Sequence, residues 1–430
     1  MRADESRVTM FPAPRLMILG ASPGQLPLIQ KAVDLGCYVI TVDYLPDNIG
    51  HGYSHHYVNC STVDQAGVLA AAQALRIDGI TTIASDVAVA TVAYVAAQLG
   101  LPGCPPHVAA TMSNKANFRA FQQTHGGNGP GFVTGSDLAA IMADIMALTP
   151  PLMFKPVDTS GSRGITRVDQ PDQAQYKRAF TYAQQFARSK VVCSEEFIEG
   201  IDVSGDGFLV NGQLQALITQ KYQCGYIPTG HSFPTNLSPA DQARVLAAVT
   251  QTCLAMGYTA GPVDFDVKVA PERVVIIEMS PRLGGNGIPK LIRRATGVDL
   301  LEITVQYALG WPIALPPALV VTNPCGSWVF GSKYAGQLTW VTPAAVVWAQ
   351  VPELFDYLVA YNCGDAVPRF EHSGNSLGYA LFDCPPLIGY AGVVQRLKKA
   401  MQMQITRARR RLAPSATLQE QINETVMGAA

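Results

Sequence analysis

The chain has 430 residues, more than a single hydrophobic core usually organises, so we expect two or three domains. Hydrophobic residues make up 48% of the chain and charged residues 15%, a composition that excludes a disordered protein. The formal net charge of -1 leaves no basic surplus, so we expect neither nucleic acid nor a membrane surface as a partner.

The nine cysteines are scattered and none has C-x-x-C spacing, so neither a cysteine zinc site nor a disulfide framework is indicated. Reduced, mostly buried thiols are typical of the cytoplasm. The first residues lack the apolar core of a signal peptide, and no stretch is long and apolar enough to cross a bilayer. These features predict a cytoplasmic location.

The N-terminal part alternates between strand-like and helix-like segments. The expected strands lie at 15–20, 37–43 and 79–84, and the expected helices at 26–35, 64–75 and 86–99. This order is typical of a doubly wound α/β domain. A run rich in proline at 101–106 ends the alternation, so we place the first domain at residues 15–106.

The remainder mixes helices and strands less regularly. Helices are expected from Lys115 and at 239–256, and strands at 151–157, 190–198, 261–269 and 273–279. A glycine-rich turn at 281–287 should lead into another helix, and prolines at 312–324 mark a further boundary. We predict a second domain at 107–312, a small α+β subdomain at 313–411 and a tail at 412–430.

The first glycine segment, residues 20–24, lacks the G-x-G-x-x-G spacing of a dinucleotide site. Pro23 also removes an amide that could face a pyrophosphate, so a plain strand-to-helix turn is favoured over nicotinamide binding. A substrate carboxylate could still contact the amides at this helix start.

A second loop follows Lys155, at the end of an expected strand. Residues 158–164 are small and flexible, so their amides can close on phosphate oxygens, and Arg163 adds a cation at the tip. An ordinary flexible turn would have the same composition. The loop is not a Walker loop, because no G-K-[ST] opens the next helix.

Acidic residues mark two further places. The segment EEFIEGID at 195–202 ends a strand and could bracket an adenine with backbone groups and apolar walls, or be an acidic surface turn. Asp264 and Glu278 lie on successive expected strands, which could bring both carboxylates to one face as Mg²⁺ ligands. Asp266, two residues from Asp264, faces the same way.

Taken in chain order, these segments resemble the motifs of the ATP-grasp superfamily. The matching motifs are LGASPGQ, VDYLPDN, Asn114-Lys115, FKPVDTSGSRGI at 154–165, EEFIEGID, GPVDFDV at 261–267 and IIEMSPRLGGN at 276–286. The resemblance implies an α/β and α+β architecture: a pre-ATP-grasp doubly wound domain, an ATP-grasp fold and a small C-terminal α+β subdomain.

The resemblance also implies a role for each matching residue. It assigns ATP binding to Lys115, Lys155, Ser160, Gly161, Ser162, Gly164, Glu195, Glu196, Phe197, Ile198 and Asp202. It assigns Mg²⁺ to Asp264, Glu278 and Ser280, and catalysis to Lys155, Arg163 and Arg282. Two positions depart from the family pattern: Ser280 stands where asparagine is frequent, and Asp202 where glutamate is. Asp266 could complete the metal site in place of Ser280.

Within the superfamily, the chain resembles the carboxylate–amine ligases related to biotin carboxylase and L-amino-acid ligases. The supporting segments are CGYIPTGHSFPTNLSP at 224–239, which resembles a loop of amino-acid ligases, and HSGNSLGYALF at 372–382. The resemblance implies small-molecule carboxylate and amine substrates and an acyl-phosphate intermediate. Dimers are common in that branch, so a homodimer is one option and the oligomeric state stays open. A bicarbonate-dependent carboxylase and a catalytically silent nucleotide-binding protein are the alternatives.

Overall fold

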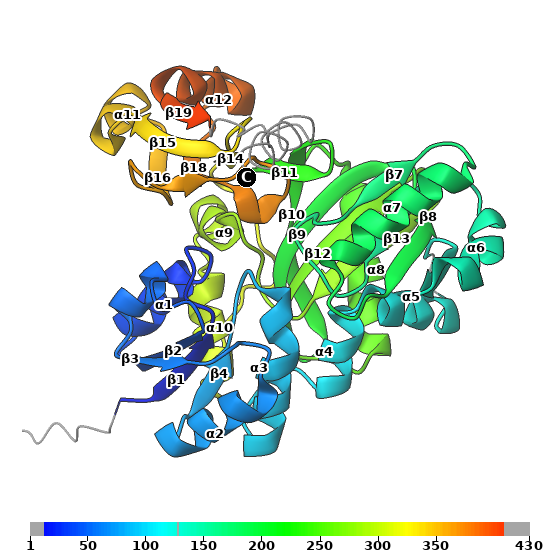
Figure 1. Ribbon diagram of the computed structural model, residues 1–430. Coiled ribbons are helices and arrows are strands. Elements are labelled where there is room, and N and C mark those ends of the chain that lie inside the picture. The colour runs from blue at the N-terminus through cyan, green and yellow to red at the C-terminus, as the bar shows by residue number, and fades with distance from the viewer. Residues whose placement is uncertain (1–12, 127–128, 408–430) are drawn as a thin grey trace, which may run out of the picture.

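The computed structural model describes residues 13–126 and 129–407 (Figure 1); the tail expected at 412–430 lies outside them. A parallel sheet of order β3-β2-β1-β4 forms the N-terminal domain. Its strands are β1 (Arg15–Leu19), β2 (Tyr38–Asp43), β3 (His56–Asn59) and β4 (Gly79–Thr81). Its helices are α1 (Leu26–Asp34), α2 (Gln65–Leu75), α3 (Asp86–Leu99) and α4 (Pro106–Met112). The doubly wound start predicted from the alternating pattern is confirmed.

A small antiparallel sheet of order β5-β8-β6-β7 follows. Its strands are β5 (Phe132–Gly135), β6 (Leu152–Pro156), β7 (Thr166–Val168) and β8 (Val192–Glu196). Helices α5 (Lys115–Thr124), α6 (Leu138–Met146) and α7 (Gln173–Phe186) accompany it. The start of α5 is fixed by Asn114, whose side-chain oxygen accepts from the amides of Ala116 and Asn117.

The largest sheet has eight strands in the order β13-β12-β9-β10-β11-β14-β18-β16. Its first five strands along the chain are β9 (Ile201–Val210), β10 (Gln213–Cys224), β11 (Ile227–Phe233), β12 (Gly261–Val269) and β13 (Val274–Ser280). The last three are β14 (Cys325–Phe330), β16 (Leu354–Val359) and β18 (Gly378–Asp383). Helices α8 (Pro239–Ala255), α9 (Ile288–Thr296) and α10 (Leu300–Ala308) belong to this part of the chain.

Two expectations change with this sheet. The loop expected at 224–239 is partly wrong, because β11 forms there by pairing with β10 on one side and β14 on the other. The loop was expected from the resemblance to amino-acid ligases, but hydrogen bonds from both neighbours hold Ile227–Phe233 as a strand. The same β11–β14 pairing carries the sheet across the boundary proposed at 312/313, so the C-terminal part extends the sheet.

The C-terminal part adds a three-stranded sheet, β17-β15-β19. Its elements are β15 (Gly336–Val341), α11 (Ala344–Gln350), β17 (Ala366–Val367), α12 (Gly389–Ala400) and β19 (Met403–Arg407). Figure 1 shows this part beside β11, with α9 and α10 between the N-terminal domain and the large sheet. Among the described residues, no helix has the length and apolar character needed to cross a membrane.

One hydrophobic cluster joins the N-terminal domain to the rest. It contains Leu16 and Leu28 of the first domain, Leu291 of α9, Phe208 of β9 and Leu381 of β18, all fully buried. Because apolar burial contributes about 25 cal/mol per Å², such a shared core holds the domains together. The position of the N-terminal domain relative to the large sheet is therefore fixed by packing.

A buried ion network joins the small sheet to the large one. The Glu195 carboxylate on β8 accepts from Arg119 Nε of α5 at 2.9 Å and from Lys155 of β6. Arg119 also donates to the backbone oxygen of Ile277 on β13 at 2.8 Å, next to Glu278. Burial alone would raise the pKa of Glu195, but Arg119 and Lys155 outweigh it and lower the pKa to about 2.

This network predicts how stability depends on Glu195. Glu195→Gln leaves two buried cations without their counterion, so the variant should lose about 3–5 kcal/mol of unfolding free energy at neutral pH. The folded pKa of Glu195 lies below the ordinary 4.5. Its contribution is therefore complete above pH 4.5 and is lost as pH falls toward 2. Urea unfolding of the unaltered protein and of Glu195→Gln measures this effect. The difference between their unfolding free energies should shrink as the pH falls from 4.5 toward 2.

Glu199→Gln is the matched control, because the Glu199 side chain is 80% exposed and its nearest cationic nitrogen, on Arg167, lies 3.9 Å away. It should leave the unfolding free energy unchanged at every pH. Equal stability of the Glu195 and Glu199 variants at neutral pH would contradict the role assigned to the network.

Candidate active site

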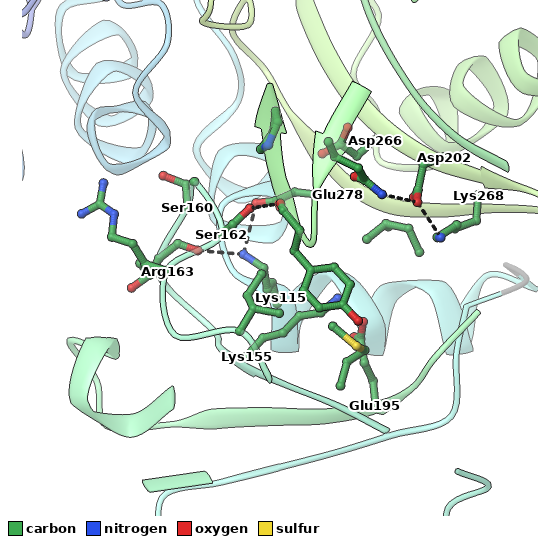
Figure 2. Close-up of a pocket in the computed structure, with 18 of the residues that line it drawn as sticks. Lys115, Lys155, Ser160, Ser162, Arg163, Glu195, Asp202, Asp266, Lys268 and Glu278 are labelled. Carbon is green, nitrogen blue, oxygen red and sulfur yellow. Dashed lines mark hydrogen bonds and ion pairs between the residues drawn. The ribbon is translucent and has the colours of Figure 1, made fainter. Parts of the chain in front are cut away.

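A cleft of about 180 Å³ lies between the small antiparallel sheet and the large sheet (Figure 2). It collects nearly all the residues predicted to bind ATP, together with the predicted catalytic residue Arg163. The ATP-binding ones are Lys115, Lys155, Ser160, Gly161, Ser162, Glu195, Glu196, Phe197, Ile198 and Asp202. Gly164 is the exception. It is buried with φ +70°, and a Cβ atom there would approach the Phe186 ring to 2.9 Å, so it shapes the loop from behind.

Two lysines bring positive charge into the cleft. Lys115 Nζ donates to Glu278 Oε1 at 3.1 Å and to the backbone oxygen of Thr159 at 2.8 Å, as Figure 2 shows. Burial alone would lower the pKa of Lys115, but Glu278 outweighs it and the pKa is raised, so this lysine stays charged. Lys155 is held by Glu195. Two fixed cations on one side of a cleft suit an anionic ligand such as a polyphosphate.

The glycine loop has the backbone that its small residues allow. Gly161, Ser162 and Gly164 have φ of +72°, +64° and +70°. For Ser162 this left-handed conformation is costly, and a hydrogen bond from its hydroxyl to the Tyr226 carbonyl at 2.7 Å helps to hold it. The amide of Ser373 donates to the Gly161 carbonyl at 3.1 Å, so the C-terminal part contacts the loop.

The acidic segment after β8 contributes mainly through its backbone and apolar side chains. The carboxylate of Glu195 points into the buried network, and that of Glu196 accepts from the amides of Gly131 and Thr149 at 3.2 and 2.9 Å. Both acids are therefore structural. Phe197 and Ile198 remain as apolar surfaces in the cleft. Such surfaces suit a flat heterocycle.

Asp202 lies where β9 begins, at the edge of the cleft. It accepts from Lys268 Nζ at 2.7 Å and from Gln223 Nε2 at 3.1 Å (Figure 2). The Lys268 ammonium also lies 4.9 Å from the centre of the Phe197 ring. This end of the cleft thus offers a carboxylate beside an apolar wall, as a ribose hydroxyl next to a base would require.

The strand register decides which acids meet. Asp266 on β12 lies directly opposite Glu278 on β13, whereas Asp264 lies opposite Ser280. Asp266 and Glu278 line the cleft, but Asp264 and Ser280 do not. The pair expected from the sequence, Asp264 with Glu278, is thus not the directly opposed pair. Sequence reasoning identified the acids but had no means of fixing the register, which also contains a bulge after Asp266.

Asp266 and Glu278 form a small acidic pair with lysine partners. Lys221 Nζ lies 2.9 Å from Asp266, and Lys115 Nζ lies 3.1 Å from Glu278. Within residues 13–126 and 129–407, no group of three or more His, Cys, Asp or Glu side chains could hold a metal ion. Mg²⁺ nevertheless fits the pair, because it is commonly bound by one or two carboxylates together with substrate phosphates.

Arg282 lies just beyond the end of β13 and is buried. Its guanidinium donates through Nε to Asp86 Oδ1 at 2.9 Å and through Nη1 to Asp264. Burial alone would lower the pKa of Arg282, but Asp264, Asp86 and Asp206 outweigh it and raise the pKa. Asp86 belongs to α3, so this arginine links the N-terminal domain to β12.

A second cavity of about 550 Å³ adjoins the cleft. The residues shared by the two spaces are Ser160, Gly161, Arg163, Lys221, Pro228, Asp266, Glu278 and Ser373. Arg282 and Asp264 line only the second cavity. A ligand there would lie beside the glycine loop and the acidic pair, so the two spaces can bring two reactants together.

Three residues of this region were missed by the sequence analysis: Lys221, Arg119 and Asp86. The alternation in β10 could have shown Lys221, since it shares a strand face with Thr219, which is buried. No pattern in the sequence marks Arg119 or Asp86, because each contacts a residue far away in sequence, Glu195 and Arg282 respectively.

Comparison with known proteins supports this picture. A model of the ATP-grasp domain matches residues 148–290. The uncharacterized protein y4rH of Sinorhizobium fredii is 25% identical over 342 residues, which are 77% of this chain and 69% of that protein. Human carnosine synthase 1 is 32% identical over 125 residues, which are 28% of this chain and 15% of that longer protein.

Among solved structures, the L-amino acid ligase of Bacillus licheniformis superposes with a TM-score of 0.77. The superposition covers 92% of this chain and 99% of the ligase at 20% identity, so it shows a common fold over nearly the whole length. The fold, the matched domain and the motif order agree with one another. Residues 148–290 therefore match an ATP-grasp domain, and the chain as a whole has the fold of an ATP-grasp ligase structure.

Proposed function

We propose that the protein is an ATP-dependent carboxylate–amine ligase that forms an amide through an acyl phosphate. The observation that carries this proposal is the junction of the two cavities. The cleft with Lys115, Lys155 and the glycine loop opens at Asp266 and Glu278 onto a larger space for other substrates. We also propose a cytoplasmic location, which rests on the scattered cysteines alone.

The nucleotide would lie with its phosphates near Lys115, Lys155 and loop residues 160–164. Its adenine would pack on Phe197 and Ile198, and Asp202 would accept from the ribose. Phosphoryl transfer depends mainly on positioning and charge neutralisation, which fixed lysines and loop amides provide.

Asp266 and Glu278 would hold Mg²⁺, and Asp266 takes the place that the sequence assigned to Asp264. When bound, Mg²⁺ supplies charge neutralisation at the phosphate oxygens. Asp264 instead accepts from Arg282, and its role is to hold that guanidinium. Ser280 is buried and lines neither cavity, so it is left out of the metal site.

The proposed reaction has two steps. A carboxylate oxygen attacks the γ-phosphorus of ATP, the bond to the β–γ bridging oxygen breaks, and ADP leaves. The amine nitrogen then attacks the acyl carbon, the bond from that carbon to the phosphate oxygen breaks, and phosphate leaves as the amine loses a proton. Arg163 and Lys221, which line both cavities, are placed to neutralise the oxygens of the transferred group.

Two of the similar proteins support a synthetic reaction, since they are named carnosine synthase and L-amino acid ligase. The match to the synthase covers a small part of that protein, and the structural likeness concerns the fold. Their substrates are therefore not transferred to this chain.

The metal assignment predicts different behaviour for two neighbouring aspartates. Asp266→Asn should weaken Mg²⁺-dependent nucleotide binding and lower turnover by about a hundredfold or more, because phosphate charge is left uncompensated. Asp264→Asn should leave the Mg²⁺ dependence of binding unchanged, since Asp264 contacts Arg282. Calorimetric titration of an ATP analogue over a range of Mg²⁺ concentrations measures both. If Asp264→Asn weakened Mg²⁺-dependent binding and Asp266→Asn did not, the metal would be assigned to Asp264.

The acyl-phosphate chemistry predicts the fate of a labelled oxygen. With an ¹⁸O-labelled carboxylate substrate, one label should appear in the released phosphate, because the bridging oxygen leaves with phosphorus when the amine attacks. A screen of carboxylates crossed with amines for ADP formation, with and without bicarbonate, identifies the pair to label. Mass spectrometry of the phosphate is the measurement, and label found only in the organic product would rule out this route.

A further inference from the structure

The second cavity has two chemically different walls. The wall from the ATP-grasp part carries the cations Arg163, Lys221 and Arg282 together with the acids Asp264, Asp266 and Glu278. The N-terminal domain contributes the opposite wall: Gly20, Ser22, Gln25, Asp43, Tyr44, Leu45, Asn48, Thr62, Ala84, Ser85, Asp86 and Val87. Among these described lining residues of the N-terminal wall, the charged side chains are Asp43 and Asp86, and none is basic.

The start of α1 offers no open amides to an anion, contrary to the expectation from the sequence. The Gly20 amide donates to the Val42 carbonyl at 2.8 Å, and the Ala21 amide to Asp43 at 3.2 Å. Next along the chain, the Ser22 amide donates to the Gln25 side chain at 3.1 Å.

The rest of the turn is closed in the same way. The Gly24 amide donates to the Ser22 hydroxyl at 3.2 Å, the Gln25 amide donates to the Ser22 carbonyl at 3.0 Å, and Pro23 has no amide hydrogen. Each backbone donor from Gly20 to Gln25 is thus satisfied inside the protein. A phosphate at this turn would find no free donor.

The other helix that begins at this wall is α3. Asp86 lies in its first turn, so the positive end of the helix already has a carboxylate beside it. That carboxylate accepts from Arg282, which ties up the nearest cation of the opposite wall. A phosphate dianion placed against the N-terminal domain would therefore face Asp43 and Asp86 without a basic partner, at a large electrostatic cost.

We infer that the amine substrate is a phosphate-free molecule that enters as an ammonium ion and binds against the wall formed by Asp43 and Asp86. This inference rests on the proposed ligase function and narrows its substrate class. Free amino acids and simple amines belong to this class, whereas ribonucleotide amines, which carry a phosphate, do not. The ammonium gives one proton to water before attack, because its nitrogen has no lone pair until then, and the second proton leaves with the released phosphate.

The test compares amines that differ only in a phosphate. A panel of matched pairs, including ethanolamine with O-phosphoethanolamine and serine with O-phosphoserine, is titrated into the protein loaded with Mg²⁺ and a non-hydrolysable ATP analogue. Isothermal titration calorimetry measures affinity without requiring turnover. The phosphate-free member of a pair should bind at least about tenfold more tightly, since the wall repels the dianion.

A charge added to the wall should reverse the preference. Tyr44 and Leu45 line the cavity and are 60% and 48% exposed, so Tyr44→Lys and Leu45→Lys should fold normally. Each should weaken binding of the phosphate-free amine and strengthen that of the phosphorylated one. Tyr53→Lys is the control, because Tyr53 is 49% exposed on the same segment and lies outside the cavity lining.

The outcomes separate this inference from the proposed function. If the phosphorylated amine binds as tightly as its partner, or if no amine binds, the inference is overturned. Ligation of phosphorylated amines to a carboxylate, with ADP released, would overturn it while leaving the ligase function standing. Amine binding without ADP formation from any carboxylate would support the wall assignment and count against the ligase.

Discussion

The buried carboxylate of Glu195 is the interaction on which the nucleotide cleft depends. It is 2% exposed and lies between Arg119 and Lys155, so two cations and one anion are buried together. An isolated charge there would cost several kcal/mol, and each member is tolerable because of the others. Arg119 extends the link to the backbone of β13 beside Glu278. Lys155 and β13 are therefore positioned by one network.

A second set of charges holds the domains together at the reaction site. Arg282 bonds Asp86 of the N-terminal domain and Asp264 of β12. Asp206, fully buried opposite Asp264, accepts from the amide of Gly284 and so fixes the turn that carries Arg282. These contacts place the N-terminal wall of the second cavity at a set distance from the acidic pair. The cavity is thus shaped by ion pairs as much as by the shared hydrophobic core.

The sequence predicted the elements well where hydrophobic periodicity is strong. The strand expected at 261–269 is β12, and the helix expected at 239–256 differs from α8 by one residue at its end. The glycine loop at 158–164 and the acidic segment at 195–202 stood out because each is rich in one kind of residue, small in the first and acidic in the second. Register and side-chain direction were not available, since both depend on the neighbouring strands. Hence the sequence did not show that Asp266 lies opposite Glu278, or that the Glu195 carboxylate points into the buried network.

The site is electrically balanced before any ligand arrives. Glu278 is paired with Lys115, and Asp266 with Lys221. In the proposed reaction, Asp266 and Glu278 would hold Mg²⁺ and their lysine partners would turn to phosphate oxygens, so each ion pair would be exchanged for another. Little charge has to be buried without a partner at any stage, and the groups need only small rearrangements. Among its described lining residues, the N-terminal wall has no lysine that could be exchanged in this way. Its Asp43 accepts hydrogen bonds from the amides of Ala21 and Leu45 instead. That wall therefore offers acids to an ammonium ion and no basic side chain to a phosphate, whereas the opposite wall carries acids and cations in pairs.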